Sequence, residues 1–515
     1  MPTFPINWTR SRRILLWSTV LLPFASLFLV HWSDKPGYEA GDYTQYLAHA
    51  TAIAEGRPYT DIGFIYTQHR AQLAAEAEPP ALPFLLAPVI AFLDSNMMLV
   101  KLFFFGAALA FLLLAGSYFA AHDDRWLGLG VALLSGLSLQ FLYAATQISA
   151  DLPFAALVWT VIALMDAPGK ARPGRIAAIA SAGALAILFR TAGVALVPAA
   201  LLYAAFRPRE RAARALIPAA VWTAVFFAMS SAIPVTGAVM SEMARPFAGI
   251  IDDMATNVRA YRFATMEALL YPFPWNTAND VYHLLAVAAM GLGLALWIRT
   301  GWARFLSAFT IAYVGMLLSL PTMGGRFLRP LFPLFIFGLL NGLRAVIRRL
   351  RPRLSATTAG RVALWTGATL GAFSVGWELT EPRPQDILDH PDVVGVYAAL
   401  ERFRTDAPMR VELLKPRIFT LHTRIPAMGL FEAEPTEVVT ELCAKRITHV
   451  VAGDLGIEPK ENAALSAAVD EYPALFLPVY ENRSFAVYRF VPTTIEHGSG
   501  AGPGPVCTSA PAAPG

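Results

Sequence analysis

Long apolar stretches constrain this chain more than any other feature. In a helix, about 20 mainly apolar residues cross a bilayer core about 30 Å thick. Of the 515 residues, 56% are hydrophobic and only 15% are charged, against about 25% charged in an ordinary soluble domain. The pattern predicts an α-helical polytopic membrane protein with about eleven transmembrane helices, three of them short. We expect these helices near residues 14–32, 98–120, 126–145, 152–166, 176–189, 192–206, 215–235, 281–298, 303–320, 330–347 and 361–378.

Clusters of arginine and lysine between the apolar stretches predict the orientation, because cytoplasmic loops are enriched in these residues. With eleven crossings, all clusters fall on one side, and residues 33–97, 146–151, 236–280 and 321–329 fall on the other. The clusters are Arg10/Arg12/Arg13, Lys170/Arg172/Arg175, Arg207/Arg209/Arg211/Arg214, Arg299/Arg304 and Arg344/Arg348/Arg349/Arg351/Arg353/Arg361. Arg10 to Arg13 with the first stretch predict an uncleaved signal anchor, since no small-x-small cleavage site follows.

The apolar stretch at residues 81–93 must not cross, because an extra crossing would invert every later loop. It has only thirteen residues and follows Pro79-Pro80. We therefore predict a helix that lies in the membrane interface. The outer loop 33–97 then belongs, with its interfacial helices, to a membrane module of residues 1–378.

Residues 379–492 are polar enough to form a small α/β domain outside the membrane, which the orientation makes periplasmic. The pattern predicts helices at 391–404, 435–446 and 462–471 and strands at 409–414, 417–423, 448–452, 476–480 and 485–490. The tail 493–515 is rich in Gly, Pro, Ala and Ser and is expected to be disordered. The two cysteines, Cys443 and Cys507, have no metal-ligand spacing, and whether they pair is open.

The net charge of +4 is spread over the short clusters between apolar runs. A nucleic-acid-binding surface would need basic residues on one continuous face. The expected surroundings are therefore the lipid bilayer, with no nucleic-acid partner.

Asp42 lies just past the outer end of the first predicted membrane helix, where an ionised group is costly unless it has a function. It is our leading candidate for a catalytic base. An aspartate at a helix start also satisfies free backbone amides, so an N-cap is the structural alternative. Asp151, two residues before Pro153, has the same two interpretations.

Several short motifs occur in order along the chain and on the same predicted side. They are Asp42-Tyr43, Gly56-Arg57-x-Tyr59, Pro79-Pro80-x-Leu82, Ser149-Ala150-Asp151-Leu152-Pro153-Phe154, Phe189-Arg190-Thr191-Ala192-Gly193 and Gly325-Arg326-Phe327-Leu328-Arg329-Pro330 with Pro333. In this order they resemble the membrane glycosyltransferases of the GT-C fold, particularly the bacterial relatives of the aminoarabinose and protein mannosyl transferases. The resemblance covers about the first 340 residues.

The resemblance implies transfer of a sugar from a polyprenyl-phosphate donor to an acceptor hydroxyl at the periplasmic face of a bacterial inner membrane. The acceptor would be a glycolipid, a glycan or a protein. Such chemistry needs a general base and cations for the leaving phosphate. Asp42 would be the base and Asp151 its partner or a group that orients the acceptor. Substrate would be bound by Tyr43, Lys101, Arg190, Arg326 and Arg329. Ordinary interfacial anchoring is the alternative for Tyr43, Lys101, Arg326 and Arg329. For Arg190 the alternative is an ion pair with a protein carboxylate, or a side chain that extends to the interface.

The chain departs from the family pattern at three places. Asp42 is followed by Tyr43 rather than by a second acidic residue, Lys101 stands where relatives tend to have arginine, and the loop 236–280 contains no histidine. We expect no required cofactor; if a divalent metal is bound, Glu78 is its candidate ligand. The alternative functions are a polymerase or ligase of surface glycans, a transporter or flippase of a lipid-linked glycan, and a scaffold without activity.

Overall fold

The computed structural model divides the chain into two compact units. The helical unit comprises Met1–Gly37 and Pro79–Arg383, and the sheet unit comprises Tyr38–Glu78 and Pro384–Gly515. The structure describes residues 10–31, 41–67, 78–93, 97–169, 172–206, 209–232, 251, 254–258, 261, 277–301, 304–319, 325–378, 387–404, 408–453 and 459–492. The predicted tail 493–515, with Cys507, lies outside these residues.

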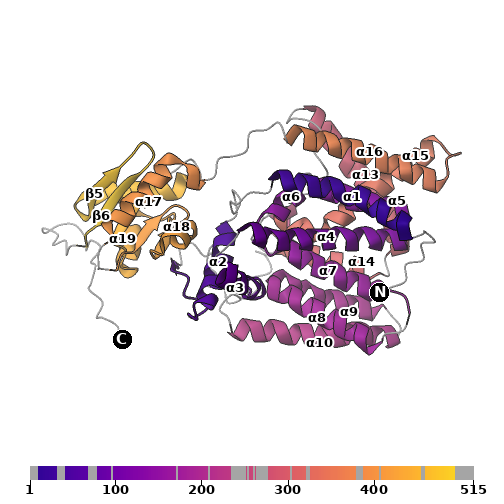
Figure 1. Ribbon diagram of the computed structural model, residues 1–515, viewed down its shortest axis with the longest axis horizontal. Helices are drawn as coiled ribbons and strands as arrows, with labels where there is room; N and C mark the ends of the chain where they lie inside the picture. Colours follow the sequence, from indigo (N-terminus) through magenta and orange to yellow (C-terminus); the bar gives the residue numbers. More distant parts are fainter. Residues whose placement is uncertain are drawn as a thin grey trace. The chain divides into compact units, whose positions relative to one another are not determined.

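The described part of the helical unit consists almost entirely of helices, and α4, α7, α8 and α10 lie side by side in it (Figure 1). Its elements are α1 (Arg10–His31), α3 (Ala81–Leu93), α4 (Met97–His122), α5 (Arg125–Leu137), α6 (Leu139–Thr146), α7 (Asp151–Asp166), α8 (Pro173–Phe189), η2 (Thr191–Ala195), α9 (Leu196–Ala205), α10 (Arg209–Ala232), α13 (Thr277–Gly301), α14 (Phe305–Ser319), η3 (Gly325–Leu331), α15 (Phe332–Leu350) and α16 (Ala356–Glu378). Helices occupy the described part of each stretch for which one was predicted, including residues 81–93, but the stretch 126–145 is divided between two helices.

Within the described residues, four helices are long and apolar enough to cross a membrane by length and composition. They are Met98–His122, Ala212–Ala232, Asp280–Gly301 and Gly325–Leu350. Shorter apolar helices accompany them, among them Pro173–Phe189 and Phe305–Ser319. The chain is a multi-pass membrane protein, and the number of eleven crossings stays a prediction.

The predicted continuous helix at 126–145 is wrong. Helix α5 ends at Leu137 and α6 begins at Leu139, because Ser138 has an extended backbone with φ −68° and ψ 127°. The Ser138 carbonyl accepts the amides of Phe141 and Leu142 at 3.0 and 2.9 Å and so starts the second helix. A break of this kind is tolerated where the backbone polar groups find new partners inside the protein.

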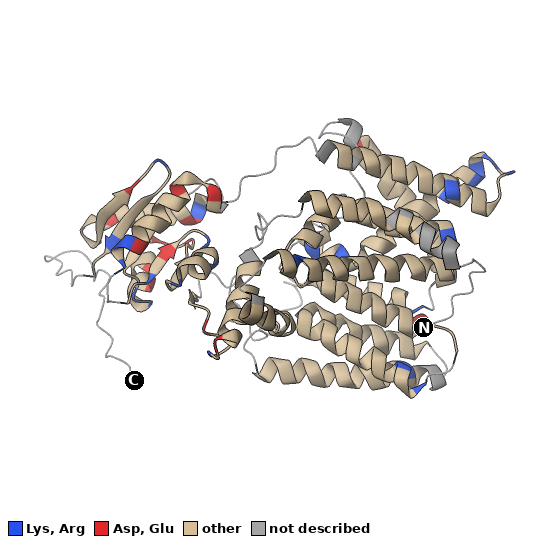
Figure 2. Ribbon diagram, in the orientation of Figure 1, with Lys and Arg blue, Asp and Glu red and all other residues tan. Residues whose placement is uncertain are grey.

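Lysine and arginine gather at the ends of the helices in the helical unit, and the middle parts of these helices are almost free of them (Figure 2). Small residues allow close packing in between. A Cβ on Gly116 of α4 would lie 2.9 Å from the Gly128 carbonyl oxygen of α5. The two backbones thus approach each other as membrane helices with small residues do.

The sheet unit contains a six-stranded sheet with the order β1-β3-β2-β4-β6-β5. Strands β1, β3, β2 and β4 are parallel to one another, and β6 pairs antiparallel with both β4 and β5. The elements are α2 (Gly41–Ala54), β1 (Phe64–Ile65), η4 (Ile387–Asp389), α17 (Pro391–Phe403), β2 (Val411–Leu413), α18 (Pro416–Thr423), β3 (Ala427–Gly429), α19 (Pro435–Ala444), β4 (His449–Ala452), α20 (Pro459–Glu471), η5 (Pro473–Leu475), β5 (Phe476–Glu481) and β6 (Ala486–Phe490).

Most predicted elements of the C-terminal region are confirmed, but the strand at 417–423 is wrong. These residues form α18, which begins with Pro416 at its first position, where proline fits a helix best. Ile418 and Phe419 are both buried, whereas His422 is exposed. Neighbouring buried residues fit a helical period and do not fit the period of two of a strand.

The expected domain boundary also needs correction. We predicted that the outer loop 33–97 belongs to the membrane module, whereas residues 38–78 form a compact unit with the C-terminal region. Strand β1 of this loop extends the sheet beside β3. A strand of two residues cannot be recognised in the sequence. The strand that stabilises it lies about 360 positions further along the chain.

Candidate functional site

A buried carboxylate holds two arginines at one end of the helical unit. Asp151 is the first residue of α7, and its side chain is 2% exposed. One carboxylate oxygen, Oδ2, accepts a hydrogen bond from Arg329 Nη1, and the other oxygen, Oδ1, pairs with Arg190 Nη1. No side-chain cap is formed at this helix start. The carboxylate is therefore engaged by guanidinium groups, and the capping interpretation of Asp151 is wrong.

Arg190 lies where the chain turns back after α8. Its amide still donates to Ala186 O at 2.9 Å, but its backbone is extended, and η2 starts at the next residue. The turn is tight, since a Cβ on Gly193 would lie 2.8 Å from the amide nitrogen of Ile187. Only glycine fits at this close approach. The predicted break between two short helices is confirmed, and it presents Arg190 at a helix terminus.

Arg329 belongs to η3, which two hydrogen bonds hold in place. Trp159 of α7 donates from Nε1 to Pro330 O at 2.9 Å, and Tyr313 of α14 donates from its hydroxyl to Phe327 O at 2.8 Å. Both donors are buried. A buried N–H or O–H is costly without a partner, so these bonds fix the position of η3 and, with it, of the arginine beside Asp151.

Phe327 organises a third guanidinium group. Arg190 Cζ lies 4.9 Å from the centre of its ring, and Arg326 Cζ lies 5.4 Å from it. Cations at this distance from an aromatic face are attracted to it. The cluster of Asp151, Arg190, Arg326, Phe327 and Arg329 therefore combines three guanidinium groups with one carboxylate, and we call it the arginine cluster.

Sequence reasoning selected four of these five residues and missed Phe327, Trp159 and Tyr313. Aromatic residues are common throughout the chain, and only the fold shows which rings contact a charge. Trp159 offered one weak signal, because it is a polar N–H donor within the apolar run of α7. Such a donor needs an acceptor when buried.

We expect that Trp159→Phe lowers the thermal stability by the loss of one hydrogen bond, about 0.5–1.5 kcal/mol, and also lowers the activity several-fold because η3 loosens. Trp222→Phe is the matched control, since Trp222 Nε1 donates to Ala180 O at 2.9 Å between α10 and α8. The two variants should lose similar stability in detergent melts. An equal activity loss in both would contradict a specific role of the Trp159 bond.

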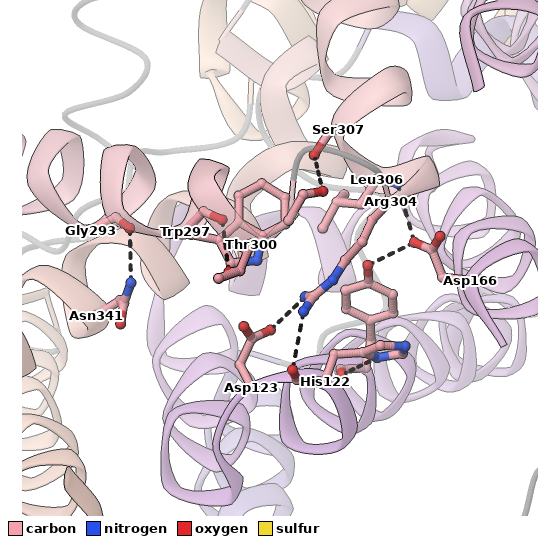
Figure 3. A network of polar contacts seen from close by, with 12 residues as sticks. His122, Asp123, Asp166, Gly293, Trp297, Thr300, Arg304, Leu306, Ser307 and Asn341 are labelled. Carbon is pink, nitrogen blue, oxygen red and sulfur yellow. Dashed lines mark hydrogen bonds and ion pairs between the residues drawn. The ribbon is translucent and has the colours of Figure 1, made fainter. Parts of the chain in front are cut away.

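A second polar network lies at the opposite end of α7 (Figure 3). Tyr118 donates to Asp166 Oδ2 at 2.8 Å, and Asp166 Oδ1 accepts the amide of Phe305 at 2.7 Å, which caps α14. Arg304 Nη1 bonds to Asp123 Oδ2 at 2.9 Å, and its Nη2 donates to the His122 carbonyl at 3.1 Å. This network joins helix ends.

The direction of the helices follows from this network. Tyr118 near the end of α4 meets Asp166 at the end of α7, so the two helices run in the same direction and their starts lie at the same end. Lys101 of α4, 1% exposed, is therefore at the same end as Asp151. The 16 residues of α7 separate this end from Arg304 by about 24 Å. Arg304 was predicted on the side opposite to the arginine cluster, in agreement with this finding.

Asp42 and Tyr43 lie at the start of α2, in the sheet unit. Tyr43 is 3% exposed, and it forms a buried stripe with Tyr46, Leu47 and Ala50. The structure thus brings together the predicted residues Asp151, Arg190, Arg326 and Arg329, whereas Asp42 and Tyr43 belong to the other compact unit. Their catalytic and substrate-binding roles stay predictions.

Glu78, the candidate metal ligand, ends the described part of the outer loop in the sheet unit and is partly buried. Among the residues that the structure describes, no group of three or more His, Cys, Asp or Glu side chains could hold a metal ion. The metal ligand role of Glu78 stays a prediction.

A buried histidine connects three parts of the outer loop. His49 Nδ1 lies 2.7 Å from Tyr59 O, and the Glu78 amide donates to His49 Nε2 at 3.2 Å. The histidine ring stacks on Tyr59 at 4.3 Å, and the Tyr59 hydroxyl donates to Glu78 O at 2.6 Å. These bonds require a neutral imidazole that carries its proton on Nδ1. Burial lowers the pKa of His49 from 6.5 to about 4, which keeps it neutral.

We expect the outer loop to loosen in acid. The folded-state pKa of His49 lies below its unfolded value, so the unfolded loop binds the proton first. The stability is complete above pH 6.5 and falls as the pH drops toward 4. Hydrogen exchange of the α2 amides, corrected for intrinsic rates, should therefore rise between pH 7 and pH 5. A His49→Gln variant keeps a donor and an acceptor but does not titrate, so an identical rise in this variant would refute the assignment.

Comparison with known proteins identifies solved structures with the same fold. The apo-state crystal structure of ArnT from Cupriavidus metallidurans has a TM-score of 0.51 and 14% identity, over 93% of this chain and 98% of ArnT. AglB, an oligosaccharyltransferase from Archaeoglobus fulgidus, in complex with an inhibitory peptide and a dolichol-phosphate, has a TM-score of 0.53 and 10% identity over 90% of this chain and 73% of AglB. The oligosaccharyltransferase of the same organism with a tethered acceptor peptide gives 0.52 and 11%, over 94% and 74%. No family model and no curated protein matches the chain.

Proposed function

Because the chain has the GT-C fold of membrane glycosyltransferases, we propose that it transfers a sugar from a polyprenyl-phosphate donor to an acceptor hydroxyl at the periplasmic face of a bacterial inner membrane. The C-terminal part of the sheet unit would then be periplasmic. The acceptor would be a glycolipid, a glycan or a protein. The neighbour AglB was solved with a dolichol-phosphate, which is a lipid phosphate of the proposed class.

The arginine cluster is the observation that carries this proposal. Guanidinium groups match the geometry of phosphate oxygens and bind them in a bidentate manner. Arg190 and Arg329 share Asp151 as counter-ion, and Arg190 and Arg326 share the face of Phe327. Cations that are already oriented need little free energy for reorganisation when a negative charge develops beside them. We therefore assign the arginine cluster, with Lys101 as a further cation, to the phosphate of the donor.

The proposed reaction exchanges one bond at the anomeric carbon for another. The acceptor oxygen attacks this carbon and its proton passes to the carboxylate of Asp42, which acts as general base. The bond between the anomeric carbon and the phosphate oxygen breaks, and its electron pair leaves with the polyprenyl phosphate. The arginines stabilise the negative charge on that leaving group. Asp151 acts by holding Arg190 and Arg329, and Tyr43 is the candidate for hydrogen bonds to the sugar. The step written in this way requires no cofactor.

A transfer assay in proteoliposomes tests the proposal. The purified chain is given a polyprenyl-phosphate sugar labelled in the sugar, together with a lipid and glycan extract as acceptor. We expect label to move from the donor to an acceptor, with one polyprenyl phosphate released per sugar transferred. Movement of intact donor between leaflets without release of polyprenyl phosphate would instead identify a flippase and refute the transferase. A product of many sugar units would identify the polymerase of the same chemistry.

A further inference from the structure

We propose that the C-terminal sheet positions α2, which carries Asp42 in its first turn, so that the docking of the outer loop on this sheet sets the rate of the chemical step. This inference rests on the proposed function. It makes the C-terminal region a part of the catalytic machinery that acts through α2. The residues that carry it are in β1, β3 and α18, together with His49 of α2 and its partners Tyr59 and Glu78, all of them within the sheet unit.

Strand β1 of the outer loop completes one edge of the sheet. Phe64 and Ile65 pair with Ala427 and Met428 of β3, and the Ala427 amide donates to Gly63 O at 3.1 Å. Ile65 is 8% exposed and belongs to the same apolar core as Met428. The pairing satisfies backbone groups at the edge of β3, and it also adds an apolar side chain to the core. Both contributions link the loop to the C-terminal region.

Helix α18 contacts the loop at several further points. It packs against α2, and Arg417 Cζ lies 5.0 Å from the centre of the Phe64 ring. At the end of the helix, Arg424 Nη2 pairs with Glu55 Oε1 at 3.1 Å. Gly63 approaches α18 so closely that a Cβ there would lie 2.5 Å from Thr420 Cγ2. The side chains of α18 and the backbone of the outer loop are therefore closely packed against each other.

The contacts of His49 transmit this docking to α2. His49 belongs to α2 and is bonded to Tyr59, five residues before β1, and to Glu78 at the end of the loop. Displacement of β1 from β3 would therefore pull on α2. A general base must lie within hydrogen-bond reach of the proton that it accepts, and a misplacement of about 1 Å costs about 100-fold in rate. Loss of the docking should thus lower kcat.

Two glycines allow a matched test in the full-length chain. Gly63 and Gly56 have φ of +73° and +69°, so alanine causes similar backbone strain at both. A Cβ on Gly56 meets nothing within 4 Å, whereas one on Gly63 meets Thr420 Cγ2. Gly63→Ala therefore tests the contact with α18, and Gly56→Ala controls for strain. Thr420→Ser removes the obstructing methyl group, so the double variant Gly63→Ala/Thr420→Ser should restore the docking.

Two measurements report on the variants: hydrogen exchange of the Ala427 and α2 amides, and kcat and KM for sugar transfer. We expect Gly63→Ala to raise the exchange of both groups of amides and to lower kcat at least about 10-fold, within the range for a misplaced catalytic group. KM for the donor should change less than kcat, because the arginine cluster is untouched. Gly56→Ala should lack these effects, and the double variant should recover both the protection and kcat.

Three outcomes would overturn the proposal. The first is faster exchange of Ala427 and α2 with unchanged kcat, the second is an equal loss of kcat in Gly56→Ala, and the third is a double variant that stays as slow as Gly63→Ala. If the wild-type chain transfers no sugar, the proposed function fails, and the exchange data alone decide the positioning. Protection of α2 that is unchanged in Gly63→Ala would then refute it, and protection lost and recovered with Thr420→Ser would support it.

Discussion

Asp151→Asn should abolish most of the activity and destabilise the helical unit by about 3–5 kcal/mol, the range for removing one partner of a buried ion pair. The side chain of Asp151 is 2% exposed, and those of Arg190 and Arg329 are 15% and 7% exposed. Asparagine keeps the shape but supplies no charge, so both guanidinium groups lose their shared counter-ion and their orientation. Thermal unfolding in detergent and the transfer assay measure the two effects.

Asp123→Asn is the control for this prediction. Asp123 pairs with Arg304 at the opposite end of the helical unit, with side chains 13% and 18% exposed. We expect a smaller loss of stability there, because more water reaches the pair, and little loss of activity in the folded fraction. If the two variants lose the same activity at equal folded fraction, Asp151 only stabilises the fold and has no specific role in the reaction. A further Arg329→Gln change in Asp151→Asn should recover part of the stability but not the activity.

Asp42→Asn should lower sugar transfer at least about 100-fold, the lower limit for the loss of a general base. The amide cannot accept the proton of the attacking hydroxyl, while the shape of the side chain is retained. KM for the donor should change little if the base acts only in the transition state. The measurement is initial rates over a range of donor concentrations, with insertion of the variant checked by reaction of an introduced cysteine with an impermeant reagent.

The matched control is Asp61→Asn on the same loop. Asp61 is exposed and pairs with Arg57 at 3.0 Å, an arrangement that contributes little to stability. This variant changes one carboxylate to an amide without touching the proposed chemistry, so its transfer rate should stay near that of wild type. Full activity of a correctly inserted Asp42→Asn protein would exclude Asp42 as the base.

Much of the helical unit could be predicted from hydrophobicity alone. Apolar runs of the right length must form helices, because a backbone in a bilayer has to satisfy its own hydrogen bonds. The break at Ser138 was missed, because it depends on hydrogen bonds from the amides of Phe141 and Leu142 to the Ser138 carbonyl. In the C-terminal region, longer helices and the hairpin were predicted correctly, while α18 was mistaken for a strand, since eight residues carry too little periodicity to separate the two.

For the site, the sequence supplied charged residues in apolar surroundings. Arg190, Arg329 and Asp151 were singled out because buried charge is expensive and needs a partner. An ion pair between Arg190 and some protein carboxylate was one of the alternatives, but Asp151 could not be identified as that partner, since α7, α8 and η3 are separated along the chain by many residues. Phe327 gave no distinguishing signal and Trp159 only a weak one, because the role of an aromatic residue depends on what its ring and polar atom touch.

The sequence by itself determined that this chain is a multi-pass helical protein with a polar C-terminal region, and that its costly charges cluster near helix ends. These properties follow from local composition, because the composition of each segment decides whether it is more stable in lipid or in water. Only the tertiary structure decided that Asp151 is a shared counter-ion and that the outer loop adds a strand to the C-terminal sheet. Both depend on contacts between distant segments, whose free energy arises only after the chain has folded and which no local pattern encodes.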